Sequence, residues 1–252
     1  MKFSVIIPTL PSKNQDYLNL CVNSFIQNSS NNYDFEVLKA ENGEGTPYPQ
    51  GQCRAVNREA KKAQGEWLFI VNDDMYFPKD WDKHLTFPSA CFSPNLLEPL
   101  EQGSAPPFLK LDAGFSMENF NRKKVDSYTN TENTIENGFN LPFFIYKDLW
   151  DCIGGYDENY DPWGTNSDSD LEYKVVLAGV QPKRKRDMLV YHFGSKSGSH
   201  LYQDYWQKNF QYFIDKWGFE RISSPQIWNA ELNIPIDKLK FKPYWMKNAH
   251  SM

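Results

Sequence analysis

The sequence predicts an α/β protein with a mostly parallel sheet flanked by helices. Three observations lead to this fold class. Apolar, β-prone runs alternate with segments of helical spacing up to Asn72, each run ends in polar turn residues, and a strand-helix-strand order requires parallel pairing with right-handed crossovers. At 252 residues the chain is long enough for one large α/β domain or two small ones.

The first half contains the regular part of this pattern. We expect strands over Phe3–Ile7, Phe35–Ala40 and Trp67–Val71, with helices over Tyr17–Gln27 and Gln52–Gln64. Pro8 stops the first strand, because proline cannot donate to a sheet ladder. Gly65 stops the second helix, since glycine favours the position after a helix end.

The second half is less regular. Many Pro, Asn, Ser and Gly residues lie between about Phe87 and Asn140, where we expect irregular strands and substrate-facing loops. Short strand candidates in this region are Ala90–Phe92 and Phe108–Leu111. The remaining expected elements are strands over Leu141–Ile145 and Met188–Phe193, and helices over Lys147–Ile153, Asp168–Ala178 and Leu201–Trp217.

Composition excludes some classes of function. A net charge of -5 gives no electrostatic footprint for nucleic acid or anionic membrane, and the basic run Lys183–Arg186 is expected to be a solvated loop. The 16% aromatic content fits sugar or base stacking as well as an aromatic core. The four isolated cysteines favour free thiols, with two disulfides as the alternative. No apolar run reaches membrane-spanning length, so we expect a cytoplasmic protein.

The most informative segment is the strand Trp67–Val71, which runs directly into Asn72, Asp73 and Asp74. Open α/β sheets bind ligands outside the carboxyl ends of their strands. Carboxylate oxygens suit hard divalent cations such as Mg²⁺, which are often shared with substrate phosphates. The segment therefore indicates a metal-diphosphate site, with an ordinary acidic turn as the alternative.

Other polar residues follow the same arrangement. The two earlier strands end at Pro8-Thr9 and at Glu41, on the same edge as Asp74. Asp168 and Asp170 begin a helix, where the N-terminal dipole favours negative charge, and His192 lies at the end of a late strand.

In this order, the segments SVIIPT, RAVNREAKKAQGEW, FIVNDD, IGGYDENYDPWG and DSDL resemble the GT-A nucleotide-sugar glycosyltransferases, closest to family 2. The resemblance covers Phe3 to about Gly218. It implies a Rossmann-like, mostly parallel sheet in a single domain over 1–218, with a nucleotide-sugar half over about 1–86 and an irregular acceptor half over about 87–218. Residues 219–252 would form a helical C-terminal extension that packs on the core or mediates self-association.

The resemblance implies a donor site. The segment Asn72, Asp73 and Asp74 matches the DXD motif, so Asp74 would bind Mn²⁺ or Mg²⁺, Asn72 would face the ribose, and His192 would complete the metal coordination. Asn72 departs from the motif, which has an acid at that position. The remaining donor-binding residues would be Pro8 and Thr9 as the floor, Glu41 near the nucleobase, and Arg54 with Asn57; a solvated helix face is the alternative for the last two.

On the acceptor side, Asp168 matches the aspartate of the Glu-Asp motif, the general base for the acceptor hydroxyl. Ser167 replaces the glutamate, so Asp170 is a second candidate for the base or else a helix-cap or supporting group. For Asp168 itself, the alternative is a helix N-cap. Trp163, Gly155 and Tyr156 would bind the acceptor, although Trp163 would serve equally as a buried anchor.

The resemblance implies a metal-dependent glycosyltransferase that moves a sugar from a nucleoside-diphosphate sugar, with a UDP-sugar favoured, to a hydroxyl of a glycan or other acceptor with inversion. Two alternatives remain: a catalytically degraded domain that binds sugars or nucleotides, motivated by Asn72 and Ser167, and a nucleotidyltransferase, which the segment PTLPSKNQD matches poorly. The Gly/Ser-rich loop over 194–200 is expected to act as a lid. The sequence indicates no oligomeric state.

Overall fold

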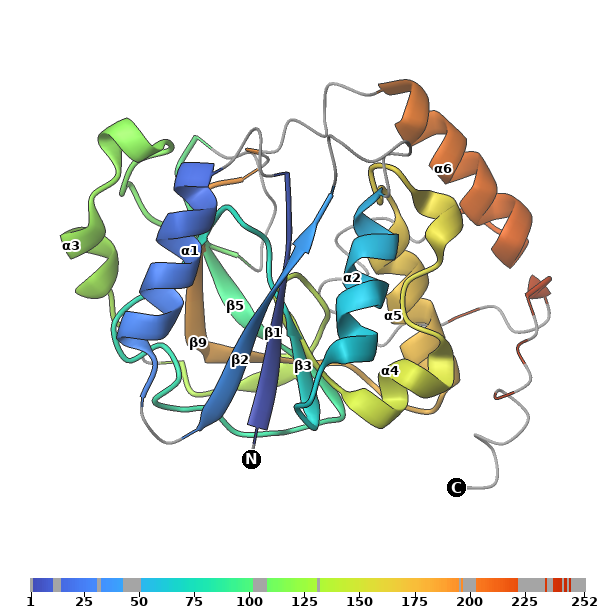
Figure 1. Ribbon diagram of the computed structural model, residues 1–252, viewed down its shortest axis with the longest axis horizontal. Helices are drawn as coiled ribbons and strands as arrows, with labels where there is room; N and C mark the ends of the chain where they lie inside the picture. The colour runs from blue at the N-terminus through green and yellow to red at the C-terminus, as the bar shows by residue number, and fades with distance from the viewer. Residues whose placement is uncertain are drawn as a thin grey trace.

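A nine-stranded mixed sheet forms the centre of the computed structural model (Figure 1). The structure describes residues 2–10, 15–30, 33–42, 51–101, 108–130, 132–194, 196, 203–221, 234, 238–241, 243 and 245. The strands are β1 (Lys2–Thr9), β2 (Asp34–Glu41), β3 (Trp67–Ile70), β4 (Met75–Tyr76), β5 (Cys91–Glu98), β6 (Leu109–Lys110), β7 (Ile135–Asn137), β8 (Phe143–Tyr146) and β9 (Lys183–His192). Their main path is β2-β1-β3-β8-β5-β9-β4, with β6 beside β5 and β7 beside β9.

Five strands of the main path point in the same direction. β2, β1 and β3 are mutually parallel, β8 is antiparallel to both β3 and β5, and β9 is parallel to β5. Because β8 is antiparallel to both of its neighbours, β5 and β9 run in the same direction as β1, β2 and β3. The carboxyl ends of all five strands therefore meet at one edge of the sheet, which is the edge that binds ligands in open α/β folds.

Helices cover both faces of the sheet. They are α1 (Gln15–Asn28), α2 (Gly51–Lys62), α3 (Arg122–Asp126), α4 (Lys147–Ile153), α5 (Ser167–Leu177) and α6 (Gln203–Trp217), with short 3₁₀ turns over Met117–Asn119 and Glu158–Tyr160. α1 lies on one side of the sheet, and α2, α4 and α5 lie on the other, with α6 outside α5 (Figure 1).

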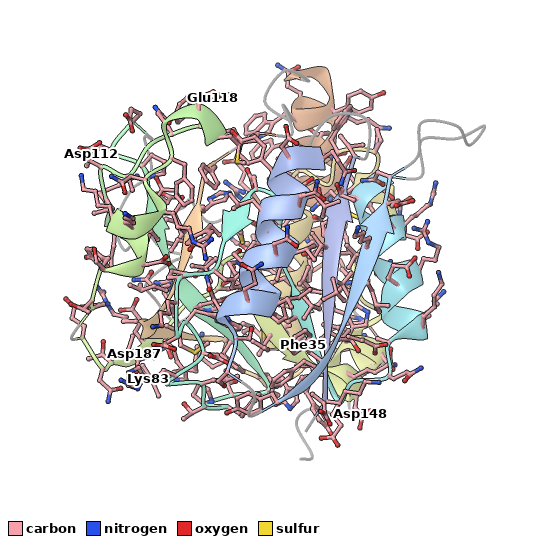
Figure 2. All side chains as sticks on the ribbon, turned by 60° about the vertical axis from the view of Figure 1, so that its left-hand side comes forward. Phe35, Lys83, Asp112, Glu118, Asp148 and Asp187 are labelled. Carbon is pink, nitrogen blue, oxygen red and sulfur yellow. The ribbon has the colours of Figure 1, made fainter. Side chains whose placement is uncertain are left out.

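The side chains of β1 alternate between two hydrophobic cores, one on each face of the sheet. Phe3, Val5 and Ile7 pack into the cluster that includes α1, whereas Ile6 packs into the cluster beneath α2, α4 and α5. Successive side chains of a strand point to opposite faces, so a strand covered on both sides is apolar at nearly every position. Charged side chains such as Lys83, Asp112 and Glu118 lie on the outside (Figure 2).

The α/β fold class and the regular first half are confirmed. The predicted strands and helices up to Val71 correspond to β1, α1, β2, α2 and β3, with ends that differ by at most two residues. α4 has the predicted bounds, and α5 starts and ends one residue earlier than expected.

The irregular second half is wrong in one respect: β5 is a full central strand whose eight residues are all buried. Pro94 lies inside it, where the register with β9 shifts between Pro94 and Asn95. Proline is tolerated within a sheet at such a bulge. Because a proline and polar residues interrupt the apolar run, the sequence pattern predicts only the start of the strand.

The solvated loop predicted for Lys183–Arg186 is also wrong. These residues form the first half of β9, and the side chains of Arg184 and Lys185 are 0% and 3% exposed. Arg184 donates to Glu136 Oε1 at 2.7 Å and to Asn140 Oδ1 at 2.9 Å. A buried guanidinium needs such partners, which come from distant parts of the chain.

Three other expectations concern the cysteines, membranes and the tail. All four cysteines are free thiols. Within the described ranges, no helix has the length and apolar character that a membrane crossing requires. Leu239 and Trp245 of the extension pack into the core beneath α5 and α6, whereas the rest of the tail and residues 195 and 197–200 of the predicted lid lie largely outside the described residues.

Candidate active site at the carboxyl edge

The proposed metal ligands lie next to each other. Asp74 is in the turn after β3, and His192 ends β9; β4 joins them, because Met75 pairs with His192 across the antiparallel ladder. Asp74 Oδ1 lies 3.4 Å from His192 Nε2, and the backbone N–H of Lys196 donates to Asp74 Oδ2 at 3.1 Å. The sheet therefore brings together two residues that are separated by more than a hundred positions.

A third residue of this cluster was absent from the sequence predictions. Glu98, the last residue of β5, places Oε1 3.2 Å from His192 Nδ1 and is 2% exposed. The neighbouring residues Leu97 and Tyr191 pair in the parallel β5–β9 ladder, which places the two strand ends side by side. An acid at a strand end is a pattern that could identify Glu98, but the sequence predicts this strand only as far as Phe92.

The charges of this cluster compensate one another. Burial disfavours the imidazolium, but the carboxylates of Asp74 and Glu98 outweigh burial and raise the pKa of His192 to about 10. Burial alone would raise the pKa of Asp74; His192 and the Lys196 N–H outweigh it and hold this pKa below its ordinary value. Asp74, which is 4% exposed, thus remains ionised, as a carboxylate that binds a cation must be.

The neighbouring tip residues differ in exposure. Asp73 is 5% exposed, whereas the side chain of Asn72 is half-buried and its carbonyl oxygen lies 3.5 Å from the Cys21 thiol. Both residues follow β3 at the carboxyl edge. Their roles toward a nucleotide stay predictions.

Thr9 and Glu41 end the neighbouring strands β1 and β2 and pair with each other in the ladder. Pro8 and Thr9 are buried, whereas Glu41 is exposed. Within the described part of the chain, the buried atoms Thr9 Oγ1 and Asn42 Oδ1 have no hydrogen-bond partner. Two such atoms at the ligand-binding edge fit a polar ligand, because buried polar groups are normally paired.

Arg54 and Asn57 both contact the turn that precedes α5. Asn57 accepts a hydrogen bond from the Tyr156 N–H at 3.0 Å and donates to the Tyr156 carbonyl at 2.9 Å and to Glu158 at 3.2 Å. Arg54, with 52% of its side chain exposed, pairs with Glu158 at 3.0 Å. These two residues of α2 therefore hold the turn before α5, and their contact with a nucleotide stays a prediction.

Asp168 lies in the first turn of α5. Five residues separate α5 from the start of β9, so the N-terminal end of α5 points back toward the carboxyl edge. The Tyr156 hydroxyl donates to Asp168 Oδ1 at 2.9 Å. Asn166, not Asp168, occupies the N-cap position, so the N-cap alternative for Asp168 is wrong.

The surroundings of Asp168 disfavour its charge. Burial raises the pKa of Asp168 to about 6, although the Tyr156 hydrogen bond and the positive charge of Arg221 act in the opposite direction. Glu172 on the next turn of α5 and Cys53 on α2 also interact electrostatically with this carboxylate. A carboxylate with such a pKa is ionised at neutral pH and can still accept a proton.

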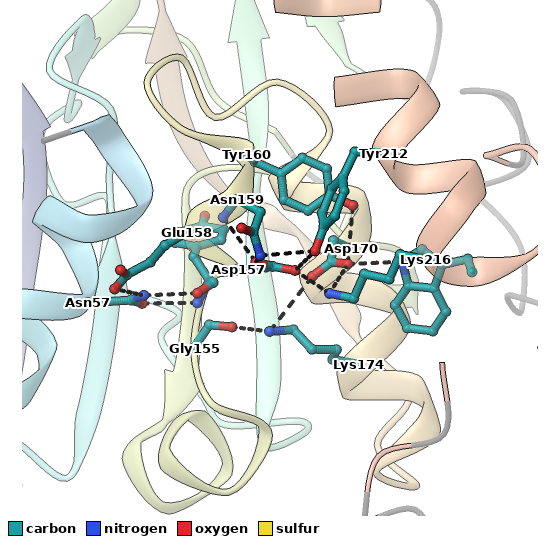
Figure 3. A network of polar contacts seen from close by, with 12 residues as sticks. Asn57, Gly155, Asp157, Glu158, Asn159, Tyr160, Asp170, Lys174, Tyr212 and Lys216 are labelled. Carbon is teal, nitrogen blue, oxygen red and sulfur yellow. Dashed lines mark hydrogen bonds and ion pairs between the residues drawn. The ribbon is translucent and has the colours of Figure 1, made fainter. Parts of the chain in front are cut away.

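Asp170 occupies a different environment. It is 0% exposed and accepts from Trp217 Nε1 at 2.9 Å, from Lys216 Nζ at 2.7 Å and from the Tyr160 hydroxyl at 3.3 Å (Figure 3). Lys216 also pairs with Asp157 at 2.7 Å. This network ties α5 to α6 and to the turn before α5, which favours the supporting role predicted for Asp170 over the catalytic one.

The residues predicted to bind the acceptor differ in their exposure to solvent. Tyr156 is 2% exposed, and Gly155, with a φ of 59°, is packed so tightly that an added Cβ would lie 2.6 Å from Asn57 Oδ1. The Tyr156 hydroxyl holds Asp168, and the contacts of Gly155 and Tyr156 with an acceptor stay predictions. Trp163 is half-buried and contacts Tyr205 of α6 at a ring distance of 6.4 Å.

No protein-family model and no curated protein matches the chain. Among solved structures, S. aureus TarS 1-349 is similar with a TM-score of 0.52 and 15% identity, over 76% of this chain and 60% of that chain. The structure of GalNAc-T7 with UDP, GalNAc and Mn²⁺ gives a TM-score of 0.56 and 16% identity, over 76% of this chain and 44% of that chain.

The chain has a GT-A fold. S. aureus TarS in complex with UDP-GlcNAc has the same fold, with a TM-score of 0.51 and 16% identity, over 77% of this chain and 61% of that chain. The match spans between 44% and 61% of the length of these three chains. This likeness establishes the fold, whereas the chemistry depends on the residues at its carboxyl edge.

Proposed function

We propose that this protein is a metal-dependent glycosyltransferase that moves a sugar from a nucleoside-diphosphate sugar to an acceptor hydroxyl with inversion. The observation that carries the proposal is the pairing of Asp74 with His192 at the carboxyl edge of a GT-A sheet, with Asp168 at the start of α5 facing the same edge. The Asp74–His192 pair would bind a cation, and Asp168 would accept a proton.

The donor set of Asp74 and His192 fits a divalent cation such as Mn²⁺ or Mg²⁺. Two ligands on neighbouring vertices of an octahedron with bonds of about 2.1 Å lie about 3 Å apart. The Asp74 Oδ1 to His192 Nε2 distance is 3.4 Å. Among the described residues no group of three or more His, Cys, Asp and Glu side chains is arranged to hold a metal, so diphosphate oxygens and water would complete the coordination.

A bound cation would neutralise the negative charge that develops on the departing diphosphate. The acceptor oxygen forms a bond to the anomeric carbon while the bond from that carbon to the diphosphate oxygen breaks. The bonding electron pair leaves with the nucleoside diphosphate, and the hydroxyl proton moves to Asp168. A single displacement of this kind inverts the anomeric centre.

A UDP-sugar is the donor class that the related folds support, because TarS and GalNAc-T7 were crystallised with UDP-GlcNAc and with UDP. Thr9 and Asn42 would supply polar contacts to the nucleotide from the ends of β1 and β2. The acceptor is a glycan or another molecule with a free hydroxyl.

The test of the proposal is donor turnover with Mn²⁺ across a panel of sugar donors, measured as nucleoside diphosphate released from UDP-, GDP- and dTDP-sugars and as CMP released from CMP-sugars. We expect turnover with one donor class, loss of turnover after EDTA treatment, and the same loss in Asp74→Asn. Asp80→Asn, an exposed acid in the turns that follow β4, is the matched control and should retain activity. Turnover that survives chelation would exclude the metal role.

The second candidate function is a binding module without turnover. Asn72 and Ser167 motivate it, because both replace acids of the motifs that they resemble. Binding of a UDP-sugar in the absence of transfer or hydrolysis across the whole panel would favour this candidate over the enzyme.

A further inference from the structure

Glu98 is a buried carboxylate that the proposed reaction does not use. It contacts the side of the His192 ring that faces away from Asp74: Oε1 lies 3.2 Å from Nδ1, whereas Nε2 faces Asp74 at 3.4 Å. The two ring nitrogens of His192 therefore meet two different carboxylates. A histidine held in this way has a defined orientation.

Glu98 is itself held in place. Its Oε2 lies 3.1 Å from Lys110 Nζ, and Glu98 pairs with Lys110 in the short parallel ladder between β5 and β6. The Glu98 side chain is 3% exposed and that of Lys110 is 27% exposed. A buried carboxylate with a cation on one oxygen and a ring nitrogen near the other has little freedom to rotate.

We propose that Glu98 is a positioning residue for the metal site. It would accept a hydrogen bond from the Nδ1–H of His192, so that Nε2 is the nitrogen that gives up its proton and becomes free for the cation that Asp74 and His192 would hold. The inference rests on the metal role in the proposed function and adds a third residue to it.

The chemistry of histidine ligands supports this role. A neutral imidazole has one N–H and one lone pair, so the partner of one nitrogen determines which nitrogen remains free to bind a metal. Carboxylates in this position orient the ring and raise its basicity, and their removal typically costs about 10–100-fold in metal affinity. A purely structural role, in which Glu98 only neutralises Lys110, predicts no change in metal affinity.

The experiment is a titration of the full chain with Mn²⁺ in the presence of UDP, followed by the electron paramagnetic resonance signal of free Mn²⁺. We expect Glu98→Ala to weaken Mn²⁺ binding about 10–100-fold. Glu98→Gln keeps an acceptor oxygen for Nδ1–H and should recover part of the affinity, which also provides a test if the alanine variant fails to fold. Glu132→Gln, a surface acid paired with Arg186, is the charge-matched control and should bind Mn²⁺ as the wild type does.

A second readout reports the tautomer directly. Side-chain ¹H–¹⁵N correlation spectra with diamagnetic Mg²⁺ and UDP, assigned by comparison with His192→Ala, should show the His192 proton on Nδ1 in the wild type and lose this preference in Glu98→Ala. A proton on Nε2 in the wild type, or Mn²⁺ affinity within twofold of the wild type in both Glu98 variants, would overturn the inference.

The same data separate this inference from the proposed function. If His192→Ala and Asp74→Asn weaken Mn²⁺ binding while the Glu98 variants do not, only the role of Glu98 is excluded. If the wild type binds no Mn²⁺ with UDP, or if His192→Ala and Asp74→Asn bind it as the wild type does, the metal role itself is excluded and the inference falls with it.

Discussion

The surroundings at the end of β9 and at the start of α5 shift the pKa values of two carboxylates in opposite directions. At the end of β9, His192 and a backbone N–H compensate the charge of Asp74 and hold its pKa below the ordinary value. At the start of α5, burial outweighs the hydroxyl of Tyr156 and raises the pKa of Asp168 to about 6. The first environment is suited to hold a cation and the second to hold a proton. Environments that separate the pKa values of two acids in this way point to their different roles.

A similar contrast exists within α5 itself. Asp168 and Asp170 are two residues apart, yet Asp170 contacts Lys216, Trp217 and Tyr160, whereas Asp168 accepts a hydrogen bond from the neutral hydroxyl of Tyr156. The first acid lies toward the carboxyl edge, and the second lies beneath α6. Substitutions at these two positions should therefore separate catalysis from stability.

The largest expected effect is on catalysis at Asp168. Asp168→Asn removes the proton acceptor and should lower the transfer rate about 10²–10⁴-fold, the usual range for loss of a general base. UDP binding should remain near the wild-type value, because Asp168 does not contact the donor in this proposal. Transfer is measured as glycosylated acceptor, and UDP binding by calorimetry. Wild-type transfer by this variant would remove Asp168 from the mechanism.

Asp168→Asn should also preserve or increase the free energy of unfolding. The folded state raises the pKa of Asp168 above its unfolded value, so at neutral pH the folded protein bears a cost for keeping this group ionised. Asparagine removes that cost. Strong destabilisation by this variant would contradict the contrast between the two aspartates.

The next effect is on stability at Asp170. Asp170→Asn leaves Lys216 and Lys174 with less compensating charge in a buried network, which should lower the free energy of unfolding by about 3–5 kcal/mol. Urea denaturation measures the change. Asp151→Asn is the control, because its pair with Lys147 lies on the surface with 52% of the aspartate side chain exposed, and its loss should cost under about 1 kcal/mol. Equal effects of the two variants would show that the buried network does not stabilise the protein.

The smallest effect is a shift in pH dependence. The wild-type transfer rate should rise with pH through about 6, where the Asp168 carboxyl loses its proton. The Tyr156 hydroxyl stabilises the ionised carboxylate, so Tyr156→Phe should raise the pKa of Asp168 and move this limb to higher pH. The profile of kcat/KM against pH measures the shift. An unchanged or lowered midpoint would indicate that another group limits the rate.

Local patterns were sufficient for the first half of the fold. In β1, α1, β2, α2 and β3 the apolar periodicity and the turn residues agree, so the order of elements and the location of Asp74 at a strand end follow from neighbouring residues. β5 and the start of β9 were not recognised, because Pro94 and the run Lys183–Arg186 contradict the local pattern of a buried strand. Their burial depends on a bulge and on partners such as Glu136 that are distant in the sequence.

The sequence by itself determined the fold class, the acid at the tip of β3 and the candidates for the proposed site. Only the tertiary structure decided which candidates meet. It joined Asp74 with His192 through the β4–β9 ladder, added Glu98 from β5, and placed Asp170 and Asn57 in contact with α6 and with the turn before α5. The reason is physical: the type of an element depends on local periodicity, whereas the environment of a side chain depends on strand order and burial, which bring together residues from distant parts of the chain.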